Sequence, residues 1–143
     1  SIAENMRGQQ LANPQTRYFS GASPEEIITS KHLEQAIRNI NNHFLFLGLT
    51  EKFDETLILM AKLFNWKYKG LIYDKLNKTP VHPKRNSINS ETIKIIEDVH
   101  SLDVELYDFS KRKYYEEIYY YRSFLKTKLV CCKMIRAISK VTN

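Results

Sequence analysis

The sequence predicts an α/β fold that is dominated by helices and contains one clear buried strand, at about residues 44–48. Apolar residues recur at helical spacing before and after a continuous apolar run, Phe44-Leu45-Phe46-Leu47-Gly48-Leu49. A short apolar run between two helical patterns is typical of a buried strand in a parallel sheet. The chain has 143 residues, so we expect residues 1–143 to form a single domain or part of one.

The segment before the run is expected to begin irregularly. Pro14 disfavours a helical conformation at Asn13, and Gly21 interrupts the chain further on. Ser23-Pro24-Glu25-Glu26 then has the pattern of a helix start, because a capping serine precedes a proline and is followed three residues later by a glutamate. A break is expected near residues 29–30. Helical spacing continues after it at Leu33, Ala36, Ile37, Ile40 and Phe44.

A second helix is expected over residues 51–64. Thr50 is a suitable N-cap, and acidic residues follow in the first turn, where the helix dipole favours them. The residues expected to face inward are Phe53, Leu57, Met60 and Phe64.

The remainder of the chain is predicted to be a long connection and two helices. Residues 66–89 are rich in Lys, Asn, Pro and Thr and form the connection. Helix resumes over residues 90–100, and a last helix runs from Asp103 towards the end, with a possible break near Ser110. Its apolar positions with helical spacing are Ile118, Tyr121, Leu125, Leu129 and Cys132.

The net charge of +6 is concentrated near the C-terminus. Residues 111–143, the basic C-terminal helical tail, contain nine Lys and Arg against two Glu, an excess of +7. Lys126, Lys133 and Lys140 are seven residues apart and would form a stripe along a continuous helix. Such an excess indicates either an anionic partner or a solvated helix face, and the sequence leaves both open.

Several classes of protein find no support in the sequence. No apolar run approaches the roughly 18 residues of a membrane span, and the first ten residues lack the apolar core of a signal peptide. The adjacent Cys131 and Cys132 suit neither a disulfide framework nor zinc, and we expect no metal. The four histidines are scattered, and no phosphate loop or nucleophile motif occurs. The tyrosines of residues 114–121 are expected to pack rather than to bind nucleic acid.

Four segments, in order, resemble those of one enzyme family. Residues 48–57, Gly-Leu-Thr-Glu-Lys-Phe-Asp-Glu-Thr-Leu, are similar to a segment of the heparan sulfate 2-O-sulfotransferase-like family, which includes uronyl and chondroitin enzymes and bacterial relatives. Asn13-x-x-Thr16-x-x-x-x-Gly21 lies upstream. Tyr73 with Leu76-Asn77-Lys78-Thr79, and then residues 103–109, Asp-Val-Glu-Leu-Tyr-Asp-Phe, lie downstream. The resemblance therefore extends over about residues 13–118.

The resemblance implies the C-terminal part of a P-loop-like sulfotransferase fold. It also implies transfer of a sulfuryl group from 3′-phosphoadenosine-5′-phosphosulfate (PAPS) to a hydroxyl of a sugar or polysaccharide. In such relatives the 5′-phosphosulfate loop, the catalytic base and an Arg/Ser pair for the 3′-phosphate precede the matched region. None of these motifs occurs here, so we expect no catalytic residue in the chain, a separate N-terminal half of the domain and possible self-association.

The same resemblance suggests where ligands would bind. The loop containing Lys75, Asn77, Lys78 and Thr79 is expected to contact the donor nucleotide, with weaker expectations for Lys84 and Arg85. Asn13, Gln15, Thr16 and Arg17 are expected either to line the acceptor cleft or to tie an irregular segment down through hydrogen bonds. The alternative function is a non-catalytic helical module that binds an anionic partner through its basic tail. The compartment stays open: eukaryotic relatives are Golgi enzymes and bacterial ones are cytoplasmic.

Overall fold

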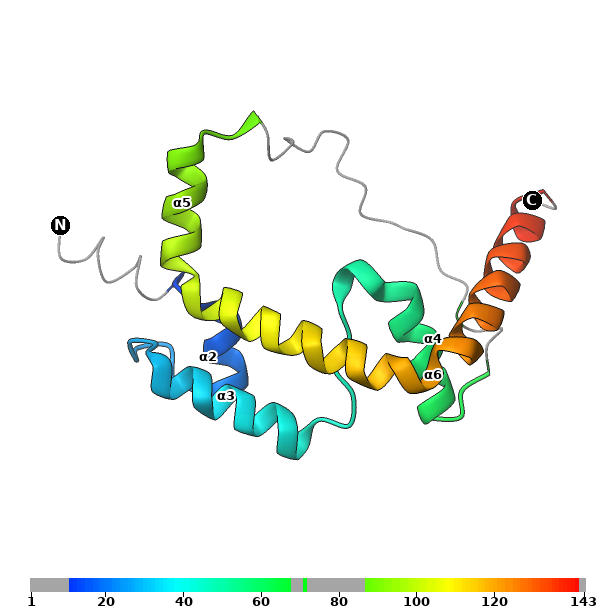
Figure 1. Ribbon diagram of the computed structural model, residues 1–143, viewed down its shortest axis with the longest axis horizontal. Helices are drawn as coiled ribbons and strands as arrows, with labels where there is room; N and C mark the ends of the chain where they lie inside the picture. The colour runs from blue at the N-terminus through cyan, green and yellow to red at the C-terminus, as the bar shows by residue number, and fades with distance from the viewer. Residues whose placement is uncertain (1–10, 68–70, 72–86, 142–143) are drawn as a thin grey trace. The chain divides into compact units, whose positions relative to one another are not determined.

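The computed structural model of the chain describes residues 11–67, 71 and 87–141, with side chains placed as far as Cys131. Its regular elements over these ranges are all helical (Figure 1). In chain order they are α2 (Pro14–Ser20), α3 (Ser30–His43), the 3₁₀ turn η1 (Thr50–Lys52), α4 (Phe53–Leu63), α5 (Ser90–Val99) and α6 (Ser101–Val141). No helix within these ranges is both long and apolar enough to cross a membrane.

The predicted α/β class, with its buried strand at 44–48, is wrong for this part of the chain, because none of the described residues is in a β-strand. The backbone of Phe44 and of Leu49 is extended, with φ of −104° and −109°. An extended segment becomes a strand only when a neighbouring strand takes up its N–H and C=O groups, and the described ranges offer no such neighbour. Leu47 and Leu49 are nevertheless buried.

The helices belong to two compact units, which we describe separately. The first unit contains α2, α3, α5 and the start of α6 as far as Lys111. The second contains η1, α4 and the rest of α6 from Arg112.

Residues 14–20, which were expected to be irregular, form the short helix α2 in the first unit. Asn13 is its N-cap, and Pro14 occupies the first helical position, where a missing N–H costs nothing. Gly21 ends the helix with a left-handed φ of 77°, and its N–H donates to the Arg17 carbonyl at 3.1 Å. Pro14 thus restricts only the cap, and the helix follows it.

The helix predicted from Ser23 does not form, and α3 begins instead at Ser30, where the break near residues 29–30 was expected. The N–H of Ser23 does donate to the Glu26 carboxylate at 2.9 Å, as a capping box requires, but the residues between them form a turn. The predicted apolar face of α3 is largely confirmed: Leu33, Ala36 and Ile40 are buried. The Phe44 ring is partly exposed, and its centroid lies 5.3 Å from the centroid of the Phe19 ring.

Helix α4 carries the core of the second unit, and the predicted face is confirmed only in part: Leu57 packs against the core, whereas the two phenylalanines do not lie in it. Phe53 and Phe64 lie at its two ends, and each is 48% exposed. Thr50 does not cap it, because the helix begins after Lys52. The buried core cluster of this unit consists of Ile58, Leu59, Ala61, Leu71 and Leu125.

The last two helices form largely as predicted. Asn89 caps α5 by accepting the Glu91 N–H at 2.9 Å, and none of the α5 residues is buried. Helix α6 continues through Ser110 without the possible break. Its predicted apolar face is confirmed within the described side chains, since Ile118, Tyr121, Leu125 and Leu129 all belong to the core of the second unit.

Gly48 is required by a close approach between the extended segment and α4. An ideal Cβ at this position would lie 2.3 Å from Cγ2 of Thr56 and 3.1 Å from its Oγ1. Ordinary contacts between carbon atoms are about 3.5–4.0 Å. Because Thr56 is β-branched, its χ1 angle has little freedom to move the methyl group away.

We therefore expect Gly48→Ala to destabilise the protein by about 1–3 kcal/mol, the usual cost of overpacking. Thr56→Ser removes the methyl group that clashes. The double variant Gly48→Ala/Thr56→Ser should therefore lose clearly less free energy of unfolding than the sum of the losses in the two single variants. The free energy of unfolding of the four proteins in urea measures this coupling. Strict additivity of the two substitutions would show that the contact does not exist.

Candidate functional site

Two helix N-termini in the first unit cap each other. Asn13, the N-cap of α2, accepts with its Oδ1 the backbone N–H groups of Leu102 and Asp103 in the first turn of α6, at 3.0 and 3.1 Å. Asp103 in turn accepts the N–H groups of Gln15 and Thr16 in the first turn of α2, at 3.0 and 2.7 Å. Each helix therefore supplies the acceptors that its partner's first turn lacks.

Two further bonds complete this junction. The Thr16 hydroxyl donates to Asp103 Oδ1 at 2.8 Å, and the Asn13 N–H donates to Nδ1 of His100 at 3.2 Å. His100 is the residue that separates α5 from α6. Asn13 is 7% exposed and Thr16 is fully buried, so water cannot readily replace these partners. The anionic Asp103 also lies where the α2 dipole favours negative charge.

The α2–α6 junction joins two of the segments that carry the family resemblance. Asn13 and Thr16 belong to the first of them and Asp103 begins the last, 87–90 residues away. Of the alternatives stated for these residues, the hydrogen-bonding role is thus observed for Asn13 and Thr16. Contact with an acceptor stays a prediction for all four residues of the group Asn13, Gln15, Thr16 and Arg17.

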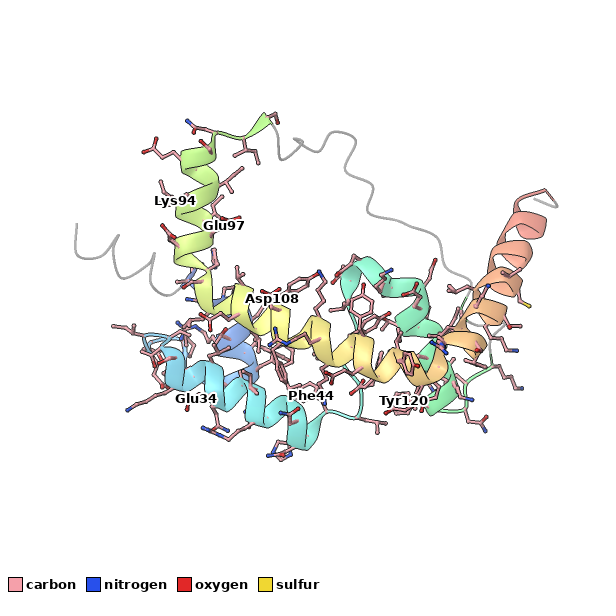
Figure 2. All side chains as sticks on the ribbon, viewed as in Figure 1. Glu34, Phe44, Lys94, Glu97, Asp108 and Tyr120 are labelled. Carbon is pink, nitrogen blue, oxygen red and sulfur yellow. The ribbon has the colours of Figure 1, made fainter. Side chains whose placement is uncertain are left out.

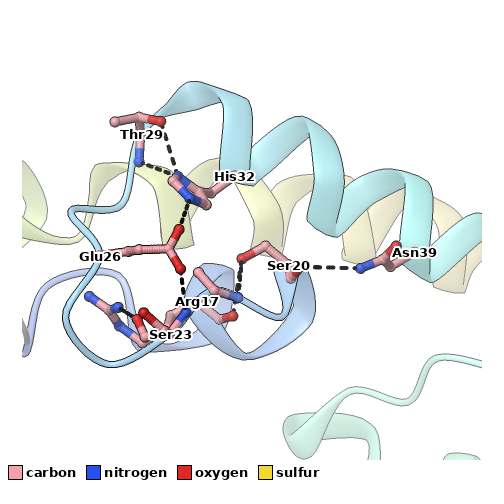
Figure 3. A network of polar contacts seen from close by, with 8 residues as sticks. Arg17, Ser20, Ser23, Glu26, Thr29, His32 and Asn39 are labelled. Carbon is pink, nitrogen blue, oxygen red and sulfur yellow. Dashed lines mark hydrogen bonds and ion pairs between the residues drawn. The ribbon is translucent and has the colours of Figure 1, made fainter.

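Arg17 lies at the edge of a second polar network, shown in Figure 3. Its Nη1 donates to the Ser23 carbonyl, while its Nε and Nη2 are buried without a hydrogen-bond partner among the described residues. Glu26 accepts the Ser23 N–H and lies 3.3 Å from Nε2 of His32. These bonds, first that from Ser23 and then that with His32, lower the pKa of Glu26.

His32 extends this network to the start of α3. Its Nδ1 accepts the N–H of Thr29, the N-cap of α3, at 3.1 Å (Figure 3). A ring nitrogen that accepts an N–H carries no proton, so in the neutral ring the proton is on Nε2, which faces Glu26. The Thr29 hydroxyl also lies 3.0 Å from Nδ1 of His32. His32 and His100 therefore both contact helix ends in this structure.

In the second unit the resembling segment at 48–57 is held by a buried tyrosine. Tyr114 on α6 is fully buried, and its hydroxyl donates to Oε2 of Glu55 at 3.0 Å. Burial, and then this bond to a carboxylate, raise the pKa of Tyr114 above the ordinary tyrosine value. Lys52 also lies 3.8 Å from Oε1 of Glu55. Glu55, which was predicted only as a first-turn acid, thus fixes α4 to α6.

The predicted donor-binding residues Lys75, Asn77, Lys78 and Thr79, together with Lys84 and Arg85, lie outside the described residues. So do the side chains of Lys133 and Lys140 in the predicted basic stripe. Over the part of the chain that is described, no group of three or more His, Cys, Asp or Glu side chains is arranged to hold a metal ion.

Sequence reasoning missed the partners of two contacts, Asp103 at the α2–α6 junction and Tyr114 at Glu55. A local signal existed for half of the junction: an Asn N-cap, a proline at the first helical position and a glycine after the last turn together mark a short helix. No local pattern reveals which distant carboxylate caps it.

Comparison with known proteins identifies the class of protein. The family model for galactose-3-O-sulfotransferase matches residues 15–128. Human galactose-3-O-sulfotransferase 3 is 25% identical over 87 residues, which are 61% of this chain and 20% of that protein. Human uronyl 2-sulfotransferase is 27% identical over 89 residues, 62% of this chain and 21% of that protein. No solved structure matches significantly.

The chain belongs to the galactose-3-O-sulfotransferase family, because the family model covers most of its length. The predicted resemblance to carbohydrate sulfotransferases is thereby confirmed, and one of the relatives is a uronyl enzyme, as the resemblance included. The chain spans about one fifth of the length of the curated relatives it matches.

The α2–α6 junction makes Asp103→Asn a sharp test. The substituted amide keeps one oxygen for Thr16, but its nitrogen cannot accept the Gln15 N–H, and the charge at the α2 dipole is lost. We expect a loss of about 1–2 kcal/mol in the free energy of unfolding, measured by circular dichroism in urea.

The matched control is Asp108→Asn, which changes an exposed carboxylate on the same helix (Figure 2). The free energy of unfolding of this variant should stay within about 0.5 kcal/mol of that of the unmodified protein. Equal effects of the two substitutions would show that the α2–α6 junction does not contribute to stability.

Proposed function

We propose that the protein transfers a sulfuryl group from PAPS to a hydroxyl of a sugar or polysaccharide. The observation that carries this proposal is the family match over residues 15–128. Two relatives are named for sulfation of a sugar hydroxyl, at galactose O3 and at a uronyl O2. The alternative, a non-catalytic helical module, is not favoured, because the match to a family of sulfotransferases reaches into both units of the chain.

The proposed reaction places clear demands on the site. The bond between sulfur and the donor's phosphate oxygen breaks, a bond between sulfur and the sugar oxygen forms, and the hydroxyl proton passes to a base. Negative charge develops on the departing 3′-phosphoadenosine 5′-phosphate, where ammonium groups and hydrogen-bond donors stabilise it. We assign no residue of this chain as the base.

The proposed donor contacts are in the loop at 75–79. Lys75 and Lys78 supply two ammonium groups, while Asn77 and Thr79 supply uncharged hydrogen-bonding groups. This set suits a nucleotide that carries several phosphate charges, because charge-assisted hydrogen bonds are the stronger kind. The resemblance of the loop to that of relatives supports the assignment.

Of the four residues in and beside α2 that were expected to contact the acceptor, we assign that contact to only two. Asn13 and Thr16 are committed to the α2–α6 junction, so we assign them a positioning role. The exposed Gln15 side chain has no partner among the described residues, and Arg17 retains two unsatisfied guanidinium nitrogens. Buried donors without acceptors are costly, which favours a ligand oxygen as the partner of Arg17.

The donor assignment predicts the effect of Lys78→Ala on nucleotide binding. A charge-assisted contact to phosphate contributes roughly 1.5–3 kcal/mol. Affinity for 3′-phosphoadenosine 5′-phosphate should therefore fall about ten- to a hundredfold, as measured by titration calorimetry on the full-length protein.

Lys94→Ala, on the exposed surface of α5, is the control and should leave the affinity unchanged (Figure 2). Unchanged affinity in the Lys78→Ala protein would remove the loop from the donor site. The reaction itself is tested with radiolabelled PAPS and galactose- or uronate-containing oligosaccharides. Absence of label in every acceptor would contradict the proposed function.

A further inference from the structure

One face of α6 in the second unit alternates exposed cations and exposed aromatic rings. The residues are Arg112, Tyr115, Tyr119, Arg122 and Lys126, which we call the α6 stripe. At 3.6 residues per turn these five positions fall within an arc of about 80°. All five side chains are exposed, whereas Tyr114 and Leu125 on the neighbouring arc are buried in the core.

The charges of the α6 stripe are not neutralised by ion pairs within the described part of the chain. Neither Arg112 nor Lys126 has an ion-pair partner among the described residues, and the guanidinium of Arg122 lies over the Tyr119 ring, 4.4 Å from its centroid. The neighbouring carboxylate of Glu117 is paired with Lys113 at 3.5 Å. Two exposed acids border the stripe: Glu116, and Asp108, which lies one turn before Arg112 on the same arc of α6. The stripe therefore presents three cations against two bordering carboxylates.

The tyrosines of the α6 stripe also need an explanation, because they are large rings left in water. Tyr115 is 46% exposed and Tyr119 is 59% exposed, although other tyrosines of the same helix pack inward. The face of an aromatic ring is electron-rich and attracts weakly positive groups. The C–H faces of sugar rings are such groups, and they offer an apolar surface of matching size.

We propose that the α6 stripe binds an acidic glycan chain, with the cations on its sulfate or carboxylate groups and the tyrosines on its sugar rings. This inference rests on the proposed function and narrows its acceptor to an acidic polysaccharide. The stripe extends from Arg112 to Lys126, a separation of 14 residues or about 21 Å at 1.5 Å per residue, which suits an elongated chain better than a compact molecule. An uncharged glycan would leave its three cations unused.

The test is fluorescence anisotropy of a labelled chondroitin sulfate chain, titrated with the protein. Arg112→Gln/Arg122→Gln/Lys126→Gln should weaken binding about tenfold, and the remaining binding should depend less on salt. The control Lys31→Gln/Arg38→Gln/Lys94→Gln removes the same charge from exposed positions on α3 and α5. This control should bind like the unmodified protein. Equal losses in the two triple variants would overturn the proposal.

The aromatic contribution is tested separately. Tyr119→Ala should weaken binding of the same chain, whereas Tyr120→Ala should not, because Tyr120 is 83% exposed on another side of α6 (Figure 2). Equal behaviour of the two variants would remove the tyrosines from the stripe. Equally tight binding of dextran, or of duplex DNA with the same response to Tyr119→Ala, would contradict an acidic glycan. None of these results depends on sulfuryl transfer, so the proposed function is tested independently.

Discussion

The first unit depends on the reciprocal capping of α2 and α6. A helix of seven residues, such as α2, is too short to be stable by itself, and its first turn has N–H groups without intrahelical acceptors. Asp103 supplies acceptors for those groups, and Asn13 in turn accepts N–H groups from the first turn of α6. Because Asn13 and Thr16 are buried, breaking one cap would leave polar groups away from water. The first and the last of the resembling segments are thereby held together, and the proposed acceptor contacts of Gln15 and Arg17 depend on this junction.

Sequence patterns predicted the helices well where one face is repeatedly apolar. The spacing of Leu33, Ala36 and Ile40 identified α3 because all three side chains are buried on one face of the helix, within the first unit. The same reasoning failed at the ends of α4, where Phe53 and Phe64 have the right spacing but lie beyond the turns that are covered. Periodicity indicates a face, but it does not indicate how far along the helix that face is packed.

The strand and the candidate site were beyond local patterns for a different reason. The apolar run at 44–49 is compatible with a strand, but pairing depends on a neighbour that the run itself does not specify. In the same way, Asn13 was expected either to line the acceptor cleft or to tie down an irregular segment through hydrogen bonds, and the sequence did not indicate that its partners are 89 and 90 residues away. The family resemblance singled out both segments without indicating that they touch. Conversely, Gly48 and Glu55 in the resembling segment at 48–57 have structural roles, so a distinctive motif here marks structure.

The most direct test of the α2–α6 junction is amide hydrogen exchange of Gln15, Thr16, Leu102 and Asp103, followed by nuclear magnetic resonance. First-turn amides of a helix ordinarily exchange without protection, because no intrahelical carbonyl accepts from them. Reciprocal capping predicts that all four are protected and that they open together, with one common free energy. If Gln15 and Thr16 exchanged at unprotected rates while Leu102 and Asp103 stayed protected, the two helices would not cap each other and the account would be contradicted.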